Sequence, residues 1–218
     1  MKRIYEALQK SDVFVGIAYE DFESVLQCLS ARTACYQKGE IIMLNGDDVT
    51  SVGMIVSGSI KIVKEDERGN ISMLTELSES EMYGEILTFA EIEHSPVTIY
   101  AAKDTEILHI DHHKIISPCA TPCPFHAKLI ENMLRHIARR NFMLNRKIEI
   151  LSKRTTKEKL LCFFDLYSHG SGTFTVPFNR EEMAQYLCVD RSAMSNELCK
   201  MRDEGLLRFQ KNQFEVFY

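Results

Sequence analysis

Residues 178–207 read FNREEMAQYLCVDRSAMSNELCKMRDEGLL, and this stretch decides the fold of the C-terminal part of the chain. Asn179 is followed three residues later by Glu182, a capping box that predicts the start of a helix. Asp190 predicts the cap of a second helix, which leaves a turn of about three residues around Cys188-Val189. Two short helices joined by so short a turn are typical of a helix-turn-helix.

The second of these helices should have an apolar inner face and a polar outer face. Met194, Leu198 and Met201 recur at spacings of three and four, so we expect them to face the core. Arginine pairs with guanine and asparagine with adenine in the major groove, and the N-terminal half of such a helix sits deepest there. We therefore expect DNA contacts from Asp190, Arg191, Ser192, Ser195, Asn196 and Lys200.

The end of the chain predicts a two-stranded wing. Leu206–Phe209 and Gln213–Phe217 alternate between apolar and polar residues about a turn at Gln210-Lys211-Asn212. Upstream, Thr155 and Glu158 form another capping box, which opens an apolar helix that belongs to the same domain.

Short β-rich runs separated by glycines extend from Ala34 to Ile110. Arg68-Gly69-Asn70 predicts a hairpin turn between two of them. Helical spacing precedes these runs, in Ile4–Leu29. The pattern predicts an antiparallel roll of about eight short strands, so the fold class is α+β. The clearest runs are Glu40–Leu44, Val52–Val56, Ser59–Val63, Ile71–Leu77, Val97–Ala101 and Glu106–Ile110.

A long helix should join the two parts. Ser117–Pro124 holds three of the five prolines and predicts a connector, and no Gly or Pro interrupts Phe125–Leu151. Its apolar stripe is compatible with packing on its own domain, but the length of the helix favours a parallel dimer. We expect domains at 1–124 (sensor), 125–153 (dimerisation helix) and 154–218 (DNA binding). The expected dimer interface is Leu129, Met133, Ile137, Leu144 and Ile148.

Charge divides the chain in the same way. The net charge of −5 combines a C-terminal part, residues 125–218, of net +5 with a remainder of net −10. Because phosphate contacts supply much of the affinity for double-stranded DNA, the basic part is where we expect the duplex to bind.

The quoted stretch, and the order of β-roll, long helix and winged helix, resemble the Crp/Fnr family of bacterial transcription regulators over essentially the whole chain. The resemblance implies a β-roll like that of a cyclic nucleotide-binding domain, a homodimer on a palindromic operator, and RNA polymerase as a further partner. It also implies that Arg191, Ser192 and Asn196 lie at recognition positions and that Arg180 contacts phosphate. One departure is Cys188, which occupies a turn position that is usually glycine.

The effector region departs further from that family. Gly84-Glu85-Ile86-Leu87 resembles its Gly-Glu-Leu segment, but Ser95 and Pro96 stand where cyclic nucleotide-binding members carry Arg-Ser. A buried phosphate without a cationic partner is costly, so we expect no cyclic AMP binding, although His94 could substitute for the cation. The candidate effector residues are Gly84, Glu85, His94 and Ser95, and the effector itself is unknown.

Cys119 and Cys123, with His126 nearby, form a second candidate sensor. They could bind a metal or form a redox disulfide, but three local ligands are too few for a closed zinc site, so an inert loop is the preferred interpretation. We expect no metal site, and no iron–sulfur cluster because the fuller N-terminal cysteine set of such members is missing.

Other classes of protein are disfavoured. The chain shows no triad order, phosphate-binding glycine loop or His-Glu-x-x-His motif, so we expect no enzyme and no catalytic residues. The seven cysteines are odd in number and scattered, which predicts reduced thiols. Since the N-terminus also has no apolar leader, we expect a cytoplasmic protein that does not bind membranes. The alternative function is a cyclic nucleotide-binding or thiol and redox-sensing module that acts through a partner protein.

Overall fold

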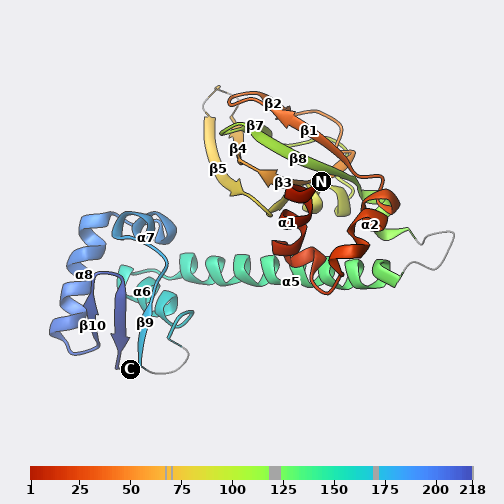
Figure 1. Ribbon diagram of the computed structural model, residues 1–218. Coiled ribbons are helices and arrows are strands. Elements are labelled where there is room, and N and C mark those ends of the chain that lie inside the picture. Colours follow the sequence, from red (N-terminus) through yellow and green to blue (C-terminus); the bar gives the residue numbers. More distant parts are fainter. Residues whose placement is uncertain (67, 70, 118–123, 169–171, 218) are drawn as a thin grey trace. The chain divides into compact units, whose positions relative to one another are not determined.

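Residues 32–111 form eight short strands in two antiparallel sheets, as the glycine-punctuated pattern predicts (Figure 1). The computed structural model describes residues 1–66, 68–69, 71–117, 124–168 and 172–217. One sheet has the order β1 (Arg32–Tyr36), β8 (Thr105–Asp111), β3 (Ser51–Ser57), β6 (Met82–Tyr83). The other has the order β2 (Ile41–Met43), β7 (Thr98–Ala101), β4 (Ser59–Glu65), β5 (Ile71–Ser78).

Gly58 makes the chain cross from one sheet to the other within a single residue. It lies between β3 and β4 with φ +91°, a conformation that L side chains rarely adopt. A side chain there would also collide with Asp104 O and Thr105 Oγ1, each 2.5 Å from the Cβ position. The glycine therefore fixes the corner of the roll.

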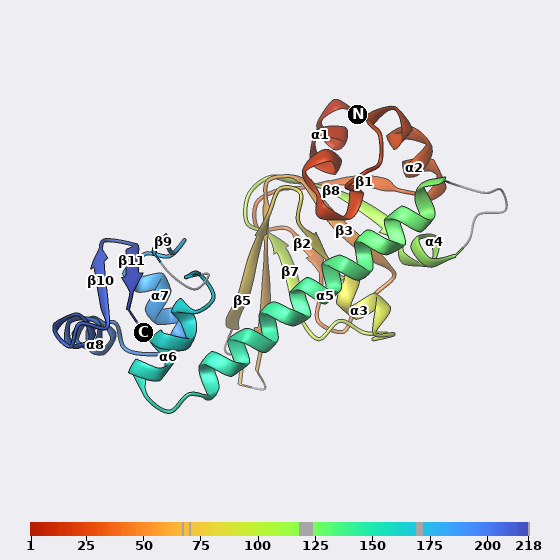
Figure 2. The ribbon, with the colours of Figure 1, turned by 90° about the horizontal axis from the view of Figure 1, so that it is seen from below.

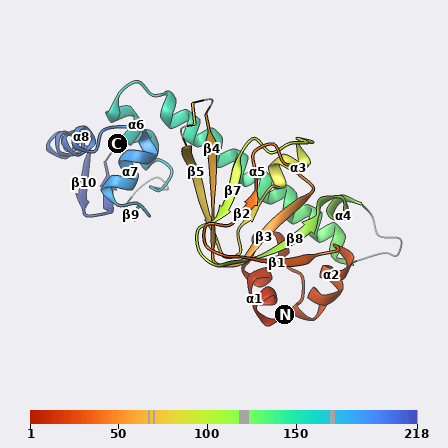
Figure 3. The same cartoon turned by 90° about the horizontal axis from the view of Figure 1, so that it is seen from above.

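Helices cover the first sheet. α1 (Lys2–Lys10), α2 (Phe22–Cys28) and two short 3-10 turns, η1 (Asp12–Phe14) and η2 (Tyr19–Asp21), lie beside β1 and β8 (Figure 3). Two more helices, α3 (Glu85–Phe89) and α4 (His112–Ile116), complete the roll. Apolar side chains of these helices and of β3 and β8 form one core, which includes Leu8, Phe14, Phe22, Met54 and Leu108.

The long helix α5 (Pro124–Ser152) contributes to that core (Figure 2). Leu129 and Met133 are only 2% and 4% exposed, packed among the N-terminal helices and the first sheet. Asn132 beside them is also buried, and its Nδ2 donates to Val13 O at 3.0 Å and to Val15 O at 2.7 Å. Of the expected interface residues, Leu129 and Met133 are packed within their own unit, whereas Leu144 and Ile148 remain 55% and 64% exposed.

The chain divides into two compact units, Met1–Ala138 and Arg139–Tyr218. The second contains α6 (Thr156–Phe164), α7 (Arg180–Leu187) and α8 (Arg191–Asp203), and its core includes Ile150 of α5. β9 (Thr173–Thr175), β10 (Leu207–Gln210) and β11 (Gln213–Val216) form a sheet of order β10-β11-β9. The sequence predicts the two wing strands and a short strand from Thr173, and the structure joins all three in this one sheet. Among the described residues, no helix has the length and apolar character needed to cross a membrane.

Candidate nucleic-acid interface and effector region

The predicted caps position the two helices of the motif. Asn179 accepts a hydrogen bond from Glu182 N at 3.0 Å while Glu182 Oε2 accepts from Asn179 N at 2.7 Å, which is the complete capping box. Asp190 accepts from Ala193 N at 2.8 Å and so caps α8. The carboxylate of Asp190, one of the expected DNA contacts, therefore caps the N-terminus of α8.

Cys188 adopts the conformation that a glycine would. Its φ of 50° and ψ of 57° are left-handed, so the turn keeps the usual geometry in spite of the substitution. Lys159 of α6 donates to Leu187 O at 3.1 Å and to Cys188 O at 3.5 Å, which gives partners to carbonyls at the end of α7. No sequence pattern indicates this role of Lys159, because Lys159 lies on a different helix, 28 residues before Leu187.

The polar face predicted for α8 is present. Met194, Leu198 and Met201 are buried at 1% exposure or less, so the opposite face of the helix is turned to solvent. The expected DNA contacts on α8 are mostly exposed: Arg191, Ser192, Asn196 and Lys200 are exposed and Ser195 is intermediate. Each of these two cations has a carboxylate near the outer limit of an ion pair: Arg191 Nε lies 3.7 Å from Glu181 Oε2, and Lys200 Nζ lies 3.8 Å from Glu197 Oε2.

Arg180, the first residue of α7, lies against the wing. Its guanidinium stacks 4.9 Å from the ring centroids of both Phe209 and Phe214. Burial lowers the pKa of Arg180, but from so high a value that the group stays charged at neutral pH. A hollow of about 460 Å³ beside it is lined by Pro177, Phe178, Asn179, Arg180, Lys211 and Asn212.

Lys211 was missed as a site residue. It occupies the predicted wing turn with φ 54° and is exposed, on the same hollow as Arg180. A basic residue at the tip of a predicted wing is a signal that could have identified it. The two cations and the N-terminus of α7 together form an arrangement that suits a phosphate group.

In the effector region, Glu85 is closed off by α5. Glu85 begins α3 after Gly84, whose φ is 83°, and its side chain is only 1% exposed. Glu85 Oε1 lies 3.8 Å from His136 Nε2, a buried nitrogen without a hydrogen-bond partner among the described residues. The long helix therefore covers the carboxylate that the sequence assigned to effector binding.

His94 and Ser95 have other partners. Ser95 is 2% exposed, and its Oγ donates to Val97 O at 2.7 Å, so the hydroxyl is used within its own turn. His94 Nδ1 lies 3.0 Å from Asp48 Oδ1. These contacts hold the loop before β7 together. His94 and Ser95 thus have partners different from His136, the partner of Glu85.

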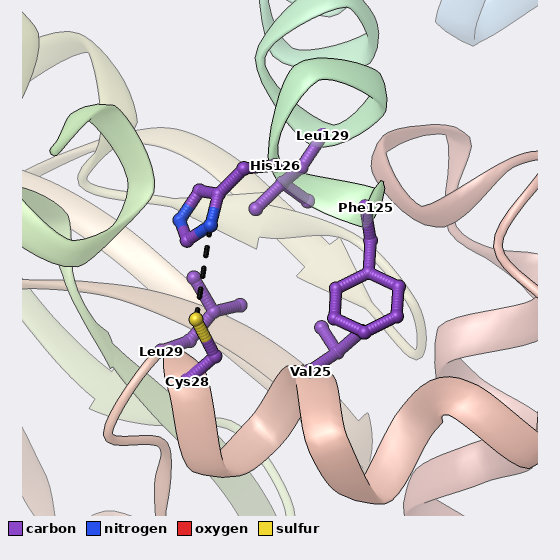
Figure 4. A pocket seen from close by; sticks show the side chains of 6 residues that line it. All are labelled: Val25, Cys28, Leu29, Phe125, His126 and Leu129. Carbon is purple, nitrogen blue, oxygen red and sulfur yellow. Dashed lines mark hydrogen bonds between the residues drawn. The ribbon is translucent and has the colours of Figure 1, made fainter. Parts of the chain in front are cut away.

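The second candidate sensor is described only in part. Cys119 and Cys123 lie outside the described residues, but His126, in the first turn of α5, is described. His126 Nδ1 lies 3.7 Å from the sulfur of Cys28, the last residue of α2 (Figure 4). Sequence reasoning could not pair these two residues, because they are 98 positions apart.

Comparison with known proteins gives matches to both parts of the chain. A cyclic nucleotide-binding domain model matches residues 34–121, and a Crp-like helix-turn-helix domain model matches residues 158–217. The cyclic AMP receptor protein of Thermus thermophilus is 23% identical over 211 residues, 96% of this chain and 94% of that protein. The transcriptional activator protein FnrA of Stutzerimonas stutzeri is 23% identical over 187 residues, 83% of this chain and 74% of that protein.

A solved structure shares the fold. The catabolite activator protein of Thermus thermophilus superposes with a TM-score of 0.53 at 21% identity, covering 95% of this chain and 94% of that one. The β-roll, the long helix and the winged helix-turn-helix thus occur in the same order in both. With both domain models matched in this order, the chain belongs to the Crp/Fnr family and is a transcription regulator with a DNA-binding helix-turn-helix.

Proposed function

We propose that the protein binds a palindromic operator as a homodimer, with α8 of each protomer in the major groove. The observation that carries this proposal is the exposed polar face of α8 above a fully buried apolar face. Arg191, Ser192, Ser195 and Asn196 occupy its N-terminal half, the part of a recognition helix that reaches base edges. Arg180 and Lys211 are proposed to hold the phosphate backbone on either side of their shared hollow.

The proposed dimer forms through the α5 stripe, which we define as Leu134, Asn141, Leu144 and Ile148. These residues follow the seven, three and four spacing of a two-stranded coiled coil, and their apolar members are 55–65% exposed. Asn141 would sit at a core position of the pair, where a single asparagine favours a parallel dimer in register. Ile137, also expected at the interface, is partly buried against the core of the first unit.

Binding selections from random DNA can separate the residues proposed to read bases, Arg191 and Asn196, from Arg180, which is proposed to contact phosphate. Arg191→Ala and Asn196→Ala should each relax the preference at one position of the half-site, because a good bidentate base contact is worth about 1 to 3 kcal/mol of discrimination. Arg180→Ala should weaken all sequences alike and lower the slope of log affinity against log salt by about one unit. An altered preferred half-site in Arg180→Ala, with no change in the other two variants, would contradict these assignments.

The effector is proposed to be something other than cyclic AMP. Ser95 has its hydroxyl in a local hydrogen bond, and Glu85 is covered by α5, so neither is free to clamp a cyclic phosphate or its sugar. We expect isothermal calorimetry of the purified protein with cyclic AMP to give no saturable heat at micromolar concentrations. Tight binding that disappears in His94→Ala would show that His94 replaces the missing cation.

The rest of the proposal follows from the regulator's role. We infer that the protein acts in the cytoplasm, where its operator is, and that it regulates through RNA polymerase rather than by catalysis. The alternative, a sensory module that acts only through a partner protein, has less support because α8 offers a complete recognition face.

A further inference from the structure

The side chain of Arg180 rests on two aromatic rings of the wing. Its guanidinium lies over the rings of Phe209 and Phe214, 4.9 Å from each centroid. These two residues are cross-strand partners on β10 and β11, and their ring centroids are 6.0 Å apart. A guanidinium within about 6 Å of a ring centroid is attracted to the ring electrons. The two rings, which we call the aromatic platform, therefore hold the arginine in place.

This attachment leaves the charge of Arg180 available. Among the described residues, the partners of its guanidinium are the two rings, and no carboxylate pairs with it. Arg202 shows the contrast: its guanidinium is 5.9 Å from the centroid of Phe209, but its Nη2 is bonded to Asp203 Oδ1 at 2.9 Å. A carboxylate neutralises an arginine and occupies its N–H donors, whereas a ring does neither. Arg180 thus keeps the charge and the donors that a phosphate group requires.

The two rings of the platform differ in how deeply they are buried. Phe214 is 1% exposed, and its centroid is 4.6 Å from that of Phe164, so it belongs to the core of the second unit. Phe209 is only partly buried and packs against the edge of that core. Phe209 is therefore the ring that can be changed without opening the interior.

We propose that Phe209 is a positioning residue for DNA binding, which orders the side chain of Arg180 before a phosphate group reaches it. The inference rests on the phosphate contact proposed above for Arg180. A free arginine side chain loses rotamer entropy when it is immobilised at an interface, and a side chain that is already ordered loses less. Phe209 itself touches no phosphate in this scheme and acts only through Arg180.

The test measures binding of the full-length protein to two labelled duplexes, the sequence that the wild type selects from random DNA and a scrambled sequence. Phe209→Leu should weaken binding to both by about fivefold or more, because each protomer loses one pre-ordered arginine. It should also lower the slope of log affinity against log salt, as Arg180→Ala does. Phe209→Tyr keeps the ring and should bind both duplexes about as tightly as the wild type.

A double-mutant cycle separates positioning from a general structural role. Phe209→Leu introduced into Arg180→Ala should cause little further loss, because the ring has no arginine left to hold. A ring that merely stabilised the wing would instead cause the same loss in both backgrounds, so that the two effects multiply. Multiplied losses would overturn the proposal.

Phe174→Leu is the matched control. Phe174 lies on β9 and stacks on Phe214 with centroids 6.1 Å apart, and among the described residues its ring contacts no arginine. This variant should bind both duplexes as the wild type does, and a loss equal to that of Phe209→Leu would overturn the proposal.

Circular dichroism at the binding temperature checks that each variant is folded. If Phe209→Leu is not, Phe209→Met fills the same space with an unbranched apolar side chain and repeats the test. A folded Phe209 variant without a ring that binds like the wild type, while Arg180→Ala is weakened, would overturn the positioning role alone. Wild-type affinity in Arg180→Ala would contradict the phosphate contact itself, and the positioning role with it.

Discussion

Replacing Leu144 and Ile148 by glutamate is expected to make the protein monomeric at micromolar concentration and to lower its affinity for the full operator by about 100-fold or more. Both side chains are exposed on α5, and in the proposed dimer each would face its counterpart in the partner. Glutamates there would bring like charges together in an apolar contact. A monomer engages one half-site at a time and loses the gain from simultaneous binding of the second.

Sedimentation velocity and binding to full and half operators measure the two effects. Ile41→Glu is the matched control, since Ile41 is a 51% exposed apolar residue on β2 and not on α5, and this variant should remain dimeric. A wild type that sediments as a monomer would refute the α5 dimer. A Leu144→Glu, Ile148→Glu variant that stays dimeric would place the interface elsewhere.

Phe163→Ala is expected to destabilise the second unit by about 3 to 5 kcal/mol. Phe163 is 0% exposed at the centre of an aromatic cluster, so its removal leaves a cavity as well as losing buried apolar area. Its ring contacts are Phe164, Tyr167, Phe178 and Tyr186, with centroids 5.2 to 6.0 Å away. Phe178 lies just before α7 and Tyr186 lies within it, so α7 would lose packing contacts that hold it in the second unit.

Urea unfolding followed by tyrosine fluorescence, together with operator binding, checks this expectation. Folded domains commonly have a net stability of about 5 to 15 kcal/mol, so a loss of that size should also depress DNA binding at 37 °C. Phe217→Ala is the control, because Phe217 is 48% exposed, and it should cost less than about 1 kcal/mol. Equal effects of the two substitutions would mean that the aromatic cluster does not stabilise the unit.

Sequence reasoning predicted helix starts well, because a helix cap depends on residues only three positions apart. The capping boxes at Thr155 and Asn179 and the cap at Asp190 act over three residues, and all three are confirmed by their hydrogen bonds. The third strand of the wing, β9, pairs with β11 almost forty residues later, and three residues carry too little pattern to show such a partner. Cys188 stands where the turn between α7 and α8 usually has glycine, yet its backbone adopts the left-handed conformation that favours glycine.

Periodicity alone could not say what each apolar stripe packs against. Leu129 and Ile148 have the same helical spacing and the same chemistry, but one is 2% and the other 64% exposed. The difference comes from the N-terminal helices, which cover only the first part of α5. For the same reason, the sequence could not indicate the partners of Glu85 and Cys28. These partners, His136 and His126, both lie on α5, far from Glu85 and Cys28 in sequence.

The division of α5 between two cores limits how the protein can be taken apart. Ile150 is 0% exposed in the core of the second unit, although it lies before the helix end at Ser152. A DNA-binding fragment that began at Arg154 would lack this residue and would carry an unfilled gap in its interior. The boundary between the compact units runs between Ala138 and Arg139, inside the helix. Helix α5 therefore cannot be treated as a linker, because its side chains contribute to the cores of both units.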